Sequence, residues 1–177
     1  MNSKYIYFSI FLIIFFIFIN RFPPRKPIDD NAIVTPASGI VMKINKGKTN
    51  TEIIIFLNVF NIHGQYFPCN AVIKNKEYYK GKFNFANLTD AIDNEEMVTT
   101  LDTKFGDIII KQKAGFLFRR IRNYTEIGKK YRQNNKLGKI IMSSRVDIII
   151  PNSLNLKIKE GQWLTAGKDV IAEQNNE

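Results

Sequence analysis

The chain is poor in the side chains that build disulfides and metal centres. Its 177 residues include one cysteine, Cys69, and one histidine, His63. A single cysteine excludes an intrachain disulfide, and we interpret Cys69 as a small core residue. One histidine beside one cysteine argues against a metal site with these ligands, so we predict none. The lone histidine is also the natural candidate for proton transfer near neutral pH.

Acidic side chains are scarce relative to basic ones. The sequence has 26 lysines and arginines against 16 aspartates and glutamates, which gives a formal net charge of +10. This excess favours an anionic partner, either nucleic acid or a lipid surface, although a solvated lysine-rich surface explains part of it. The basic residues are dispersed and form no zinc-finger, RNP or helix-turn-helix pattern. We expect no nucleic-acid partner and keep an RNA-binding β barrel as the weakest alternative.

The N-terminus carries the one long apolar run. Residues 5–19 are uncharged, and a helix of that length rises about 22 Å against a hydrocarbon core of roughly 30 Å. A cleaved signal peptide is the rival interpretation, but residues 20–24 (Asn-Arg-Phe-Pro-Pro) make a poor cleavage site. We therefore predict an uncleaved membrane anchor over residues 1–20. Basic residues on its C-terminal flank place the following domain weakly on the cytoplasmic side.

A proline-rich linker, residues 21–31, precedes a domain with β signals over residues 32–177. Short apolar runs separated by turn residues predict a mainly β fold, a compact barrel or sandwich of short strands. The runs are residues 33–34, 40–42, 52–60, 107–111, 139–142 and 146–150. Residues 90–98 and 116–124 have room for a helical turn, and the second could equally be a strand. Residues 158–172 show a lipoyl-like hairpin pattern whose glycines suit positive φ, without a modifiable lysine at a tip.

A serine pair lies between two apolar runs, where residues 142–147 read Met-Ser-Ser-Arg-Val-Asp. Most such pairs mark turns in which the hydroxyls bond the backbone. A hydroxyl held at a tight corner between strands can instead attack the preceding carbonyl, and β-elimination then cuts the chain and leaves a pyruvoyl group. In that hypothesis Ser144 is the nucleophile, Ser143 supplies the carbonyl, and His63 takes or orients the hydroxyl proton.

This segment resembles the maturation site of phosphatidylserine decarboxylases of the short, bacterial type. Other segments resemble the same family in the same order, and together they cover about residues 33 to 173. They are residues 34–41, residues 55–63 with Pro68, Phe85-Ala86 with Asn94-Glu95, residues 111–121, and the glycine-containing pattern near the C-terminus.

The resemblance implies a zymogen that cuts itself between residues 143 and 144 into two chains. It implies a covalent pyruvoyl cofactor derived from Ser144, which forms a Schiff base with phosphatidylserine and releases CO2 to give phosphatidylethanolamine. The enzyme would be a carboxy-lyase of phospholipid biosynthesis that acts on anionic lipid in a membrane, and homo-oligomer formation stays open. Arg145 could hold the lipid phosphate, and Arg119 and Arg120 could face anionic headgroups.

Three positions depart from the family pattern. The family has aspartate where this chain has Ser38, glycine at Ser143, and arginine at Glu96. A Ser38 hydroxyl can hydrogen-bond an imidazole, but it cannot stabilise an imidazolium as a carboxylate does. The alternative function is therefore an inactive homologue, a membrane-anchored β domain that binds phospholipid or protein.

Overall fold

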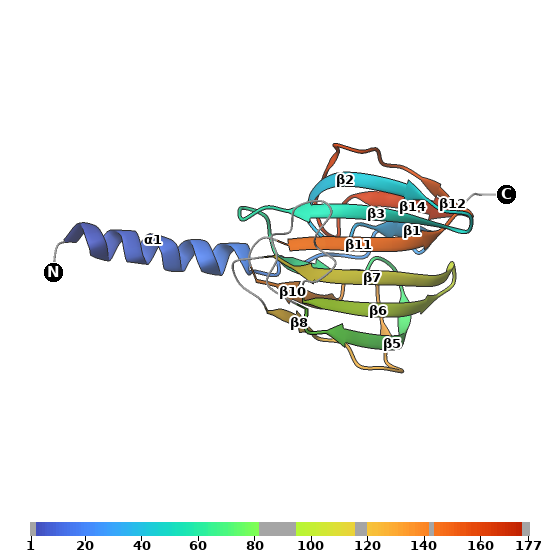
Figure 1. Ribbon diagram of the computed structural model, residues 1–177, viewed down its shortest axis with the longest axis horizontal. Helices are drawn as coiled ribbons and strands as arrows, with labels where there is room; N and C mark the ends of the chain where they lie inside the picture. The colour runs from blue at the N-terminus through green and yellow to red at the C-terminus, as the bar shows by residue number, and fades with distance from the viewer. Residues whose placement is uncertain (1–2, 82–94, 116–119, 142–143, 175–177) are drawn as a thin grey trace.

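The computed structural model describes residues 3–81, 95–115, 120–141 and 144–174. One helix, α1 (Ser3–Ile19), projects from a domain built of β-strands (Figure 1). The strands are β1 (Ala32–Val34), β2 (Gly39–Lys46), β3 (Asn50–Leu57), β4 (Gly64–Tyr66), β5 (Ala71–Tyr79), β6 (Glu96–Thr103), β7 (Gly106–Ala114), β8 (Ile121–Asn123), β9 (Lys130–Tyr131), β10 (Lys136–Ile140), β11 (Ser144–Pro151), β12 (Leu154–Leu156), β13 (Trp163–Leu164) and β14 (Val170–Gln174). The mainly β prediction is confirmed.

The strands form one large sheet and two small ones. The large antiparallel sheet has the order β13-β2-β3-β11-β7-β6-β5-β9, and the small sheets have the orders β1-β14-β12 and β4-β10-β8. The isoleucine-rich runs predicted as buried strands are β3, β7 and β11, which lie side by side in the large sheet. One apolar cluster joins all three sheets, since it includes Ile33 of β1, Ile140 of β10 and Ile148 of β11.

Of the two predicted architectures, barrel or sandwich, the barrel is not formed by the described residues, and the predicted C-terminal hairpin is wrong. The large sheet does not close into a barrel among the described residues, because the two-residue strands β13 and β9 form its edges and the small sheets cover the core instead. The C-terminal pattern is not a paired hairpin: β13 pairs with β2, whereas β14 pairs with β1 and β12. Its glycines do take positive φ, 78° at Gly161 and 68° at Gly167.

The helical turn for which residues 90–98 have room is not formed in the part of this segment that the structure describes. Residues 90–94 lie outside the described residues, and Glu96 to Val98 begin strand β6, which pairs with β5 and β7. Val98 and Thr99 are β-branched and favour such a pleated surface. In the second ambiguous segment, residues 121–123 form strand β8, and residues 116–119 lie outside the described residues.

Helix α1 and the linker lead directly onto the domain. Most apolar side chains of α1 are exposed, but Ile19 at its end is buried. In the described part of the chain, no helix reaches the combined length and hydropathy that crossing a membrane requires. The linker packs on β4: the Phe22 ring lies edge-on to Tyr66, and the Tyr66 hydroxyl donates to the Pro23 carbonyl.

Candidate active site

Ser144 is the first residue of β11 and lies in the middle of the large sheet. It is directly opposite Leu57 of β3 on one side and Ala114 of β7 on the other. The side chain is fully buried, and within the described residues its Oγ has no hydrogen-bond partner. The hydroxyl therefore makes none of the turn-stabilising hydrogen bonds to described residues that are common for such serines.

His63 is buried, and its imidazole is poorly hydrogen-bonded. Its side chain is fully buried, and within the described residues neither ring nitrogen makes a hydrogen bond of normal geometry, although the Asn61 backbone lies close enough to favour the protonated ring. Burial lowers the pKa of His63 below its ordinary value, because the charged form loses its hydration, while the nearby Asn61 backbone raises it in part. The imidazole is therefore neutral at pH 7 and able to accept a proton.

Two short connections bring His63 to the end of the sheet where Ser144 lies. Strand β3 ends at Leu57, opposite Ser144, and residues 58–62 lead from there to His63. The amide of Ile140, at the end of β10, donates to the His63 carbonyl at 3.4 Å, and β10 is followed closely by Ser144. This is the end of the domain that α1 joins (Figure 1).

Ser38 does not form the hydrogen bond with His63 that a hydroxyl at this position could make. Its buried Oγ accepts a hydrogen bond of 2.9 Å from the Ala166 amide, and the His63 nitrogens remain unpaired. The reason is local, because a buried backbone amide needs an acceptor and Ser38 supplies it. Ser38 thus joins the segment around β2 to the C-terminal segment.

The arginines predicted to bind the lipid differ in their surroundings. Arg145 makes a two-pronged ion pair with buried Asp147, at 2.6 Å and 2.9 Å, and Lys113 lies 3.3 Å from the same carboxylate. The guanidinium fork is thus already occupied within the protein. Arg120 is exposed, as a headgroup contact would require. Arg119 and Ser143 lie outside the described residues.

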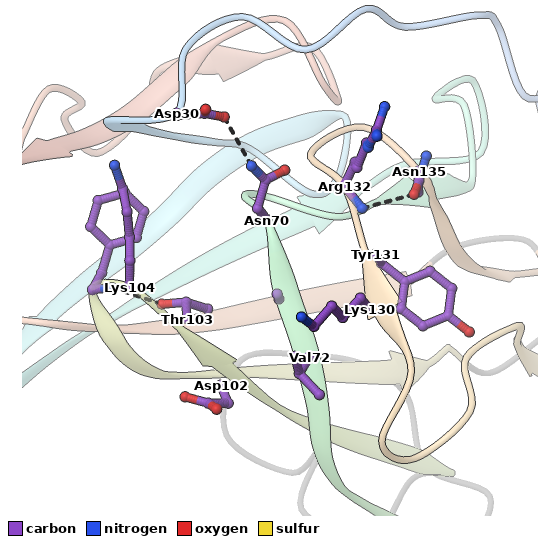
Figure 2. A pocket seen from close by; sticks show the side chains of 12 residues that line it. Asp30, Asn70, Val72, Asp102, Thr103, Lys104, Lys130, Tyr131, Arg132 and Asn135 are labelled. Carbon is purple, nitrogen blue, oxygen red and sulfur yellow. Dashed lines mark hydrogen bonds between the residues drawn. The ribbon is translucent and has the colours of Figure 1, made fainter.

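A cavity of about 790 Å³ lies elsewhere, beside β5, β9 and the turn between β6 and β7 (Figure 2). Its walls include Lys104, Lys130 and Arg132 together with Asp30 and Asp102. None of the predicted site residues that the structure describes lines this cavity.

Sequence reasoning gave no role to Gln65, which follows His63 by two positions and lies in β4. Within the described residues, six buried side-chain polar atoms lack a partner, and four of these belong to His63, Gln65 and Ser144. In the sequence, the only signal for Gln65 was its closeness to His63.

Comparison with known proteins identifies relatives of this chain. The family model for phosphatidylserine decarboxylase matches residues 12–172. A phosphatidylserine decarboxylase proenzyme of Chlorobaculum tepidum is 34% identical over 169 residues, covering 91% of this chain and 78% of the relative. A putative archaetidylserine decarboxylase proenzyme of Methanococcoides burtonii is 33% identical over 171 residues, covering 96% and 80%.

These matches define the class of the protein: a family of lyases that act on phospholipids, some of whose members are named as proenzymes. The chain belongs to the phosphatidylserine decarboxylase family.

Proposed function

We propose that this protein is a self-processing decarboxylase of phosphatidylserine or a closely related serine phospholipid. The observation that carries the proposal is the buried, unpartnered Ser144 hydroxyl in a family whose relatives are named proenzymes. A buried hydroxyl without a hydrogen bond costs roughly 1–3 kcal/mol, so a fold that keeps one has a use for it.

In the proposed maturation, His63 accepts or orients the hydroxyl proton of Ser144. Oγ attacks the preceding carbonyl carbon, the C–N bond breaks, and the amide becomes an ester. β-Elimination then releases the carboxylate of residue 143, and water replaces nitrogen at residue 144, which leaves a ketone and ammonia. Neutral His63 suits the first step, because burial lowers its pKa.

The residues around Ser144 fit a ketone of this origin. The position is fully buried between two paired strands, which would exclude bulk water and fix the direction of the group. Such a ketone supplies an electron sink for the substrate amine as CO2 leaves. His63 would return a proton to the substrate carbon after this loss.

Helix α1 supports an interfacial location for the reaction. Its exposed apolar side chains would enter a bilayer, and its C-terminal end meets the backbone of His63. Phe60 is 73% exposed and stacks edge-on with Phe15 of α1, which extends the apolar surface onto the domain. A lipid headgroup would thus reach the site without leaving the membrane surface.

The second candidate is an inactive homologue that binds lipid without chemistry. The Ser38–Ala166 hydrogen bond favours it, since the aspartate of the family pattern is replaced by a side chain that makes no hydrogen bond with His63.

Mass measurement under denaturing conditions separates the two candidates. A decarboxylase should yield a C-terminal piece of 34 residues (144 to 177) with a carbonyl-reactive end. It should also release CO2 from phosphatidylserine vesicles. A protein that stays at full length through long incubation with lipid, and releases no CO2, would establish the inactive homologue.

A further inference from the structure

We propose that the side-chain amide of Gln65 binds the carboxylate of the serine headgroup beside residue 144. This inference rests on the proposed function and assigns a substrate-binding residue to it. It starts from the fully buried Gln65, whose Nε2 has no hydrogen-bond partner.

A chain of hydrogen-bonded amides determines which polar atom of the Gln65 side chain lacks a partner. The backbone amide of Thr125 can only donate, and it donates to Asn123 Oδ1 at 3.1 Å. Asn123 Nδ2 must then donate, and it reaches Gln112 Oε1 at 3.1 Å. Gln112 Nε2 in turn donates to Gln65 Oε1 at 2.6 Å. The orientation of each amide follows from the one before, so the free group of Gln65 is the NH2 donor.

The sheet register places Gln112, the hydrogen-bond partner of Gln65, near Ser144. Ser144 is opposite Ala114 of β7, and Gln112 lies two residues before Ala114, so both side chains project from the same face of the large sheet. Such diagonal neighbours lie about 7–8 Å apart. Gln65 reaches this face from β4 by its contact with Gln112.

A neutral amide suits a carboxylate that must lose its charge. In decarboxylation the negative charge leaves the carboxylate, so a cationic partner would stabilise the ground state more than the transition state. An uncharged amide can orient the carboxylate while stabilising its charge less strongly than a cation would. The nearest described cation on β11, Arg145, is already paired with Asp147.

The proposal predicts a selective effect on substrate. In Gln65→Met, which keeps the shape of the side chain, the cut before Ser144 should proceed as in the wild type. With phosphatidylserine in mixed micelles, kcat/KM should fall roughly ten- to hundredfold, the range for a hydrogen bond to a charged group. The inhibition constant of phosphatidylethanolamine, which lacks the carboxylate, should stay unchanged.

Gln65→Glu adds a pH readout that a structural role would not give. A carboxylate at this position repels the substrate at pH 8, and its protonated form recovers a donor at lower pH. Activity relative to wild type should therefore rise as pH falls. Thr99→Val is the matched control, because it weakens the far end of the same amide chain and leaves Gln65 in place.

Three outcomes would overturn the inference. They are an equal loss of affinity for both lipids, a folded Gln65→Met that stays uncut, and Gln65 variants with wild-type kinetics. A wild-type protein that neither cuts itself nor releases CO2 would refute the proposed function itself.

Discussion

The backbone amide of His63 donates a hydrogen bond of 2.8 Å to the carbonyl oxygen of Ile19, the last residue of α1. The apolar helix therefore ends on the residue proposed as general base. The next residue along, Gly64, makes this contact possible, because a Cβ there would lie 2.8 Å from the Phe22 ring and 3.1 Å from the Arg21 carbonyl.

We expect Gly64→Ala to loosen the linker from β4 while the sheets stay folded. The added methyl group must displace Phe22, so the bond after Arg21 should become a faster target for trypsin. Gly161→Ala is the control: it carries a positive φ of 78° but has open space around its Cβ, far from the linker contact. Equal trypsin sensitivity in both variants would contradict the predicted packing.

Ser144→Ala should abolish the cut without loss of stability. Because Oγ has no partner, its removal sacrifices no hydrogen bond, and the unfolding midpoint in urea should stay equal or rise. Denaturing mass measurement should show only the full-length chain. A fragment from this variant would show that another residue is the nucleophile.

Ser38→Ala should behave in the opposite way. It leaves the buried amide of Ala166 without its acceptor, which should cost about 1–3 kcal/mol of unfolding free energy. Because Ser38 makes no hydrogen bond with His63, the cut should proceed at nearly the wild-type rate. A stable but uncut Ser38→Ala protein would restore Ser38 to the catalytic machinery.

The lowered pKa of His63 predicts two pH effects. In the unfolded chain His63 titrates near 6.5, and in the folded chain it titrates lower. Between these values the unfolded state binds more protons, so stability is complete above pH 6.5 and declines as pH falls below it. His63→Gln should remove this contribution to the slope, as measured by urea unfolding between pH 5 and pH 8.

The rate of self-cleavage should follow the same titration. If neutral His63 is the base, the first-order rate should rise with pH along a titration whose midpoint lies below pH 6.5, and then level off. An unchanged rate of cleavage in a folded His63→Gln protein would remove His63 from the mechanism.

Asp147 should contribute strongly to the free energy of unfolding. Its buried carboxylate is shared by Arg145 and Lys113. Asp147→Ala leaves Arg145 without its partner and Lys113 with Glu96 alone, at 3.8 Å, and should cost about 3–5 kcal/mol. Arg145→Ala should cost less, because Lys113 stays at 3.3 Å. An Arg145→Ala protein of unchanged stability that binds phosphatidylserine weakly would instead support the phosphate role.

The sequence predicted the strands better than their partners. Ile53 to Ile55 and Ile148 to Ile150 read as buried strands because three apolar residues in succession suit a strand covered on both faces. Hydrophobic periodicity does not indicate which strands pair with one another. The open large sheet, and the separate sheets of β13 and β14, therefore could not be derived from it.

For the site as well, the sequence identified individual residues better than their partners. The family resemblance identified Ser144 and His63, and the structure finds both buried with unused polar atoms. Gln65 went unnoticed because its meaning depends on Gln112, 47 residues away in the chain. Ser38 was assigned to His63 from a pattern, whereas its actual partner, Ala166, comes from a segment 128 residues later.

Strands β11, β13 and β14 begin at or after Ser144. Each of them is nevertheless hydrogen-bonded to strands that precede Ser144: β11 to β3 and β7, β13 to β2, and β14 to β1. Severing the backbone at Ser144 would therefore leave two interwoven polypeptides, inseparable by dilution or gel filtration, that come apart only when the whole domain unfolds.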